Sequence, residues 1–194
     1  RHWLRADEVG STAYKTRNHA LSGAWRGDDQ LLQLGLGFQD IPYQFYPNQR
    51  MDMTRNDAWH ANLRYEGRFD WGRLEARAWH EHTRHGMQFG DDKQFGYGPR
   101  GDVPGMPMDT RGRTTGARVM GELPLSDRDT LRVGAEALHY RLDDWWRPSG
   151  GGMAPNTFWN IRDGQRDRID VFAEWQARWN PQWLTLLGLR SANT

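Results

Sequence analysis

Residues 59–69, WHANLRYEGRF, alternate apolar and polar side chains without a break. The first set comprises Trp59, Ala61, Leu63, Tyr65, Gly67 and Phe69, and the second comprises His60, Asn62, Arg64, Glu66 and Arg68. Successive side chains of a β-strand point to opposite faces, so this spacing predicts a strand with one apolar face and one ionic face. A helix, with its period of 3.6 residues, would mix the two sets.

The same alternation recurs along the chain. In residues 169–179 the apolar phase carries Ile169, Val171, Ala173, Trp175, Ala177 and Trp179. Shorter versions occupy residues 32–38, 74–78, 117–123 and 131–137. With a first strand near residues 14–26 and a last one from Trp183, the sequence predicts about eight strands and an all-β fold.

Charged residues of the predicted strands keep to the phase opposite the apolar one. They are Arg64, Glu66, Arg68, Glu75, Arg77, Arg118, Glu122, Arg132, Glu136, Asp170, Glu174 and Arg178. An arginine facing lipid at the middle of a bilayer costs about 2–4 kcal/mol, whereas the inner wall of a barrel accommodates charge. The constant phase is therefore typical of transmembrane barrel strands.

The connections between the predicted strands alternate in length. Short turn-forming stretches lie at residues 27–29, 70–72, 126–129 and 180–182, and long stretches rich in Gly, Pro and Asn lie at 41–56, 86–111 and 144–165. Structureless loops of that length are uncommon in compact soluble domains. Outer-membrane barrels combine tight periplasmic turns with long extracellular loops, so we expect an antiparallel transmembrane β-barrel segment.

Composition supports this interpretation. The chain has 194 residues, no Cys, a net charge of +1 and 11 Trp, 6 Tyr and 7 Phe. Interspersed charges of both signs do not favour nucleic acid as a partner, and no apolar run reaches the length of a membrane-spanning helix. The aromatic residues predict girdles at two membrane interfaces. The alternative from another class is a soluble Trp-rich β-sandwich that binds carbohydrate.

Methionine and histidine gather in the predicted loops. His85-Gly86-Met87 projects an imidazole and a thioether from one short stretch at the top of a strand, and these donors favour Cu(I). We take His85 and Met87 as the candidate metal ligands. Weaker candidates in the loops are Met51, Met53, Met106 and Met108, with Met153 in the third loop. His80 and His82 are interpreted as interface or hydrogen-bonding histidines.

No spacing in the sequence brings together a nucleophile and a base, and no phosphate-binding loop or zinc-peptidase helix is present. We therefore do not expect an enzyme.

Several stretches resemble the barrel of TonB-dependent outer-membrane receptors, in particular the copper receptor subgroup. They are residues 43–53 (YQFYPNQRMDM), 85–90 (HGMQFG), 105–110 (GMPMDT), 141–146 (RLDDWW), 157–161 (TFWNI) and 183–188 (WLTLLG). The resemblance covers most of the chain from about residue 20 onward.

The resemblance implies a barrel of about 22 strands around an N-terminal plug, in the outer membrane. Residues 1–194 are then expected to be a fragment of the barrel domain without the plug, in contact with membrane lipid and coupled to TonB through the missing plug. In the copper receptor subgroup, a His-x-Met motif of the barrel joins a Cys and a Met of the plug to bind copper, and His85-Gly86-Met87 matches the barrel half.

The expected function is copper import, with a copper ion, Cu(I), as transported ligand. The nearest alternative keeps the barrel and changes the cargo to an iron siderophore or another chelate. That cargo would be bound by loop aromatics, namely Tyr43, Tyr46, Trp145 and Trp146.

Overall fold

The computed structural model describes residues 4–5, 8–89, 93, 96–97, 100, 103–148 and 156–194. All regular structure in these ranges is β-strand, as predicted. No helix in the described ranges is long and apolar enough to cross a bilayer.

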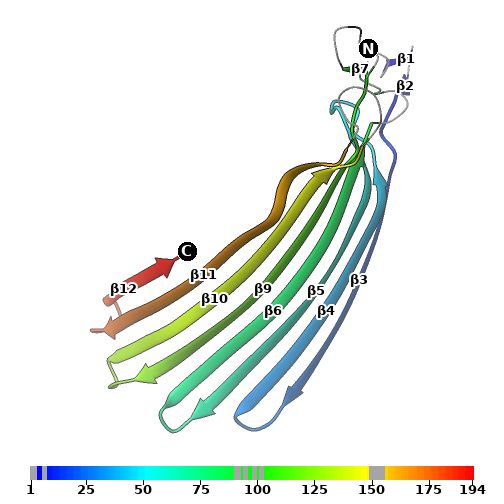
Figure 1. Ribbon diagram of the computed structural model, residues 1–194. Coiled ribbons are helices and arrows are strands. Elements are labelled where there is room, and N and C mark those ends of the chain that lie inside the picture. Colours follow the sequence, from blue (N-terminus) through cyan, green and yellow to red (C-terminus); the bar gives the residue numbers. More distant parts are fainter. Residues whose placement is uncertain are drawn as a thin grey trace.

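Eight long strands form one antiparallel sheet (Figure 1). They are β3 (Tyr14–Arg26), β4 (Gln30–Gln44), β5 (Asp52–Phe69), β6 (Gly72–Gln88), β9 (Met108–Pro124), β10 (Asp129–Trp146), β11 (Phe158–Arg178) and β12 (Leu184–Asn193). Their order in the sheet follows the chain, β3-β4-β5-β6-β9-β10-β11-β12. Two short pairs accompany them, β1 (Leu4–Arg5) with β2 (Glu8–Val9) and β7 (Gly96–Tyr97) with β8 (Val103–Pro104). The predicted count of eight strands is confirmed.

The short turns all lie at one end of the sheet, and the longer connections lie at the other (Figure 1). The turn between β5 and β6 depends on Gly72, whose φ is +139°. A Cβ at Gly72 would lie 2.0 Å from the carbonyl oxygen of Glu122 on β9, so only glycine fits this close approach. Gly27 closes its own turn by donating its backbone N–H to the carbonyl of Gln30 at 2.9 Å.

One face of the sheet, here called the apolar face, is built from the predicted apolar phase. Its central row runs through direct cross-strand partners: Leu34, Leu63, Ala78, Ala117, Ala137 and Ile169. Large side chains on this face are exposed, for example Leu21 at 70% and Ile169 at 63%. Among the described residues, the buried hydrophobic ones are only Met53 and Ala177. The apolar face is therefore not covered by a second layer.

The opposite face, here called the ionic face, carries the twelve charged residues predicted for it, and several of them form ion pairs across strands. Arg132 on β10 bridges Glu122 on β9 and Glu174 on β11, each at 2.6 Å. Arg168 reaches Glu136 at 2.7 Å and Asp170 at 3.1 Å. Opposite charges on neighbouring strands stabilise their register, because a slip of one residue would move them to the apolar face.

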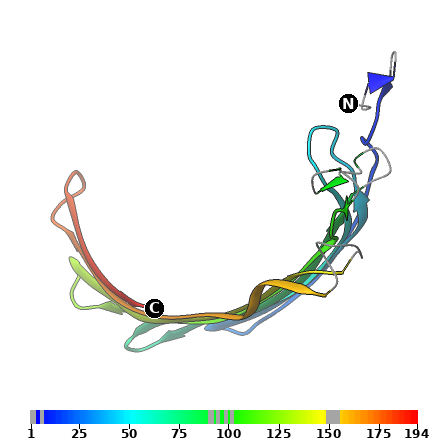
Figure 2. The same ribbon diagram turned by 45° about the horizontal axis from the view of Figure 1, so that its top comes forward.

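The sheet curves into an open arc, with β3 at one edge and β12 at the other (Figure 2). The eight strands contact only their neighbours within this sheet. A β-sandwich needs two sheets packed face to face, and the eight described strands do not form one. The architecture of the carbohydrate-binding alternative is therefore not the one found.

The strands extend further than predicted. β4, β5, β6, β9, β10 and β11 all continue into the stretches predicted to be long loops. A membrane crossing needs only about 9–11 tilted residues. Beyond about that length the period-two pattern of the sequence fades, while backbone pairing continues. The loops are correspondingly shorter than the sequence pattern suggested.

Candidate functional site

The candidate ligands lie near the loop ends of β5, β6 and β9, on the ionic face. His85 and Met87 are two residues apart on β6, so their side chains share that face. The motif lies at the top of a strand, as predicted, but the loop predicted to begin at Gly86 does not include Met87, because β6 continues to Gln88 and pairs with both neighbours as far as Met87. A strand holds the two donors more rigidly than a loop would.

Three methionines form a row across the sheet at this level. Met87 pairs directly with Met53 on β5 and with Met108 on β9. Directly opposed residues have Cβ atoms about 5 Å apart and point to the same face. Met53 is 5% exposed, and the other two are half-buried. Met53 and Met108 were predicted in loops, and they too are strand residues.

A β-bulge brings Met53 onto the ionic face. The register between β5 and β6 shifts between Met53 and Arg55, so one extra residue stands on β5 at this point. One inserted residue moves each side chain beyond it in the strand to the face opposite the one it would otherwise occupy. Without the bulge, Met53 would share the phase of Trp59 and point to the apolar face.

His85 belongs to a second, polar row next to the methionines. Its partners are Asn56 on β5 and Thr110 on β9, and Thr110 in turn pairs with Asp144 on β10. His85 Nδ1 lies 3.2 Å from Asn56 Oδ1. An amide oxygen only accepts, so Nδ1 carries the proton and donates, which leaves the Nε2 lone pair available for a metal.

The surroundings of His85 favour its neutral form. Burial lowers the pKa of His85, and the negative charge of Asp144 opposes that shift in part. The apolar belt is the band of the apolar face in which the side chains are apolar, and on β6 it consists of Leu74, Ala76 and Ala78. His85 lies beyond this belt, toward the loops. A neutral imidazole is the form that binds a metal ion.

A buried ion pair lies beside the methionine row. Lys93 Nζ donates to Asp52 and to the backbone carbonyl of Tyr46, and Lys93 and Asp52 are both buried. Asp52 also accepts a hydrogen bond from the backbone N–H of Tyr46 at 2.8 Å. Asp52 directly precedes the buried Met53 in the chain, so these contacts hold the β4–β5 connection in place next to Met53.

The other candidates are more scattered. Met51 and Met106 lie in the connections just before β5 and β9, and Met153 lies outside the described residues. Of the aromatic residues proposed for a chelate, Tyr43, Trp145 and Trp146 are strand residues and not loop residues. Trp146 pairs with Met108 and so shares the ionic face with the methionine row. Trp145 and Tyr43 point to the apolar side of their strands.

The sequence pattern did not reveal Asn56, Thr110 or Asp144 as neighbours of His85. Their proximity depends on cross-strand register, and residues 56, 85, 110 and 144 are far apart in the chain. In the described part of the chain, no group of three or more His, Cys, Asp or Glu side chains is placed to hold a metal ion.

Solved structures share this arrangement of strands. The copper transporter OprC matches with a TM-score of 0.76 and 18% identity, over 96% of this chain and 29% of its own. The fold is that of a β-barrel segment. A mutant of the ferric enterobactin receptor PfeA from Pseudomonas aeruginosa matches with a TM-score of 0.59 and 21% identity, over 94% of this chain and 30% of its own.

This chain therefore spans less than a third of either structural neighbour. Neither a protein-family model nor a curated protein matches its sequence.

Proposed function

We propose that this chain is part of the wall of a TonB-dependent outer-membrane receptor that imports copper. The observation that carries the proposal is the cluster of His85, Met87, Met53 and Met108 on the ionic face, at the end of the sheet away from the short turns. Imidazole and thioether donors together suit Cu(I) better than hard cations. Import moves the ion without bond chemistry on this chain, so no catalytic residue is assigned.

The membrane location rests on the apolar face. Its side chains are exposed along eight strands, and aromatic residues lie at both ends of the apolar belt. Phe38 and Trp59 lie at the loop end, and Trp25, Phe69 and Trp71 lie at the turn end, where Phe69 and Trp71 stack at 5.3 Å. Lipid covers such a belt, and aromatic rings mark its two interfaces.

The open edges of the sheet support the domain assignment. β3 and β12 do not pair with each other, and an unpaired edge in hydrocarbon leaves backbone groups without partners. Further strands of the same receptor would close the wall. In this proposal, residues 1–194 belong to the barrel domain, and a plug supplies both the remaining copper ligands and the contact with TonB.

A Cu(I) titration of the intact receptor that contains this chain tests the proposal. His85→Ala and Met87→Ala should each weaken Cu(I) binding by at least tenfold, because each removes one of few donors. Two matched controls are His19→Ala, whose histidine lies on β3, and Met120→Ala, on the ionic face of β9 at the level of Val119 and far from His85. Unchanged affinity in both site variants would remove the copper assignment.

The second candidate keeps the barrel and exchanges the cargo for an iron siderophore or another chelate. The match to a ferric enterobactin receptor favours it, as does Trp146 beside the methionine row. Competition separates the two candidates. Under this alternative, a ferric chelate should bind the receptor, and Trp146→Ala should weaken that binding while His85→Ala does not.

A further inference from the structure

The apolar face carries a cluster of positive charge just beyond the apolar belt, on β6, β9 and β10. On each of these strands an alanine of the central row is succeeded, on the same face and toward the loops, by polar and basic residues. On β6 these follow Ala78, on β9 they precede Ala117, and on β10 they follow Ala137. They are His80, His82 and Arg84 on β6, Thr115, Arg113 and Arg111 on β9, and His139 and Arg141 on β10. Cross-strand pairing puts His82 beside Arg113, and Arg84 beside Arg111. The cluster is thus one continuous patch.

Two of these arginines, Arg84 and Arg113, form no ion pair with an acidic residue in the described part of the chain, and Arg113 has only the longer-range attraction of Asp143. The acidic residues of the patch are already engaged, Asp143 by Arg111 at 2.7 Å and Asp167 by Arg141 at 2.9 Å. Asp57, which lies opposite Arg84, is bound by Arg55 at 2.5 Å. Arg84 and Arg113 are both exposed. Their charges are therefore available to an external anion.

Arg84 and Arg113 are placed to act together. Arg113 is the direct partner of His82, two residues before Arg84, so the two arginines are diagonal neighbours on adjacent strands. Residues at diagonal positions on adjacent strands are close enough for long side chains to approach the same point. Two guanidinium groups can therefore hold one phosphate, whose oxygens accept paired hydrogen bonds from the planar donor set of each arginine.

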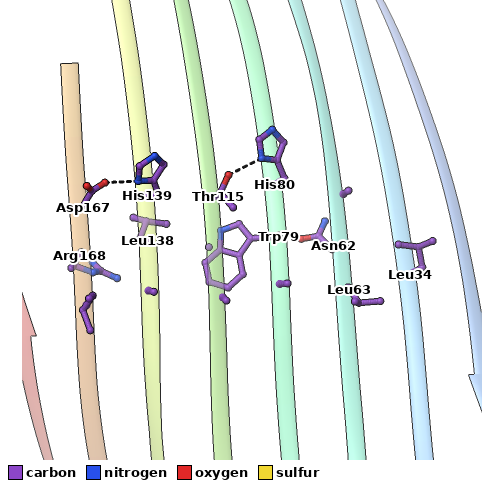
Figure 3. Close-up of a pocket in the computed structure, with 16 residues that line it drawn as sticks. Leu34, Asn62, Leu63, Trp79, His80, Thr115, Leu138, His139, Asp167 and Arg168 are labelled. Atoms are coloured by element: carbon purple, nitrogen blue, oxygen red, sulfur yellow. Dashed lines mark hydrogen bonds and ion pairs between the residues drawn. The ribbon is translucent and has the colours of Figure 1, made fainter. Parts of the chain in front are cut away.

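An apolar trough lies directly below this patch. Figure 3 shows His80 with Thr115 and His139 with Asp167 across its polar end, joined by contacts of 2.7 Å each. Its floor is formed by the small side chains of Ala78, Ala117 and Ala137 with Ala61 beside them, and Leu34, Leu63 and Ile169 also line it. The trough has a volume of about 650 Å³. A second groove of about 450 Å³ continues it toward the turns over Ala76, Val119 and Ala135.

An indole marks the boundary between patch and trough. The Trp59 ring lies 4.9 Å from that of His80 and 6.4 Å from that of His82. Tryptophan prefers the level of a membrane where headgroups meet hydrocarbon. The arginines above this level match a charged headgroup, and the apolar trough below it matches an acyl chain. One lipid molecule has both parts.

We propose that this face is a specific binding site for a phosphorylated lipid of the surrounding leaflet. The phosphate lies between Arg84 and Arg113, and one acyl chain lies in the alanine trough. This inference rests on the proposed membrane location but not on the proposed copper cargo. The occupant is a lipid and not a free anion, because the two arginines lie on the same face as the groove, just above its polar end at His80 and Thr115, and only hydrocarbon fills that groove favourably.

Native mass spectrometry of the intact receptor in mild detergent tests the site, with bisphosphorylated lipid A as the probe. Arg84→Gln combined with Arg113→Gln should reduce lipid retention by about tenfold or more. The control is Arg17→Gln, on the same face of β3, where Asp40 already neutralises the arginine at 2.6 Å. Ala117→Leu should also reduce retention by filling the trough, whereas Ala173→Leu, outside the trough on β11, should not.

Three results would overturn the proposal. One is equal retention of lipid A by the double arginine variant and the unaltered protein. Another is equal retention of dephosphorylated lipid A, and the last is displacement by inorganic phosphate at concentrations similar to those of the lipid. A Cu(I) titration on the same samples keeps the two proposals separate, since the lipid variants should bind copper normally. Heat-dependent gel migration of each variant confirms that it has folded.

Discussion

Met53 on β5 and Met87 on β6 are directly opposed partners on the ionic face, and Met108 on β9 continues their row. Only the bulge in β5 allows this arrangement, because it turns Met53 away from the apolar face. A row of thioethers two residues beyond His85 offers a soft ion several donors at once.

Replacing the flanking methionines tests whether they take part in copper binding. Met53→Leu and Met108→Leu keep side-chain volume and remove sulfur, so the fold should tolerate them. We expect each to weaken Cu(I) binding about tenfold, measured by competition with a coloured chelator. Met120→Leu, lower on β9, is the control. Equal affinities in all three variants would restrict the site to His85 and Met87.

The Asn56 side chain is expected to set the tautomer of His85. Asn56→Ala removes the acceptor at 3.2 Å, so Nδ1 loses the partner that keeps its proton in place. Loss of such a supporting hydrogen bond lowers metal affinity by about 10–100-fold. Asn62→Ala on the same face of β5 is the matched control. If both variants bind Cu(I) alike, the hydrogen bond has no part in presenting His85.

Copper binding should resist mild acid. Burial lowers the pKa of His85 from its usual value of 6.5, so the imidazole stays neutral to a lower pH than an exposed histidine. The fall in Cu(I) affinity that depends on His85 should therefore have its midpoint below 6.5. His85 also contributes stability that is complete above 6.5 and lost as the pH falls below it, because the unfolded chain takes up the proton first.

Asp144→Asn should move that midpoint further down, since the charge of Asp144 is the influence that raises the pKa of His85. Titration of the imidazole by NMR in the variant and the unaltered protein measures the difference directly. A midpoint that rises in the variant would contradict the assigned role of Asp144.

Asp170 should be a strong determinant of stability on the ionic face. It is 1% exposed and accepts from Arg168 at 3.1 Å and from Arg190 on β12. Asp170→Asn leaves both arginines without their shared carboxylate. Because those partners are themselves partly exposed, we expect a loss of about 1–3 kcal/mol in unfolding free energy. Urea unfolding in lipid vesicles measures it, with the exposed turn residue Asp127→Asn as the control.

Adjacent residues on β9 test the membrane assignment. Val119 lies on the apolar face and Met120 on the ionic face, at the middle of the belt. Val119→Arg should cost about 2–4 kcal/mol in lipid vesicles, whereas Met120→Arg should cost far less. Similar stabilities for the two variants would indicate that the apolar face does not meet hydrocarbon.

The strand count, the two faces and the alternation of short and long connections could all be predicted from the sequence. Each of these features is local in the sequence. In a strand such as residues 59–69, for example, the alternation of apolar and polar side chains shows which face each residue occupies. Strand ends were predicted less well. Residues 86–88 of β6 were predicted to be loop, because the sequence there no longer alternates apolar and polar side chains although the backbone still pairs.

The sequence by itself determined which side of each strand is apolar and that His85 and Met87 share a face, because side-chain direction within a strand repeats every two residues. The tertiary structure alone decided that Met53 and Met108 flank Met87, that Asn56 meets His85, and that Arg84 and Arg113 lie above a trough of alanines. Those relationships depend on register and on a single bulge. Both are fixed by the hydrogen bonds and packing of whole neighbouring strands, so no local pattern encodes them.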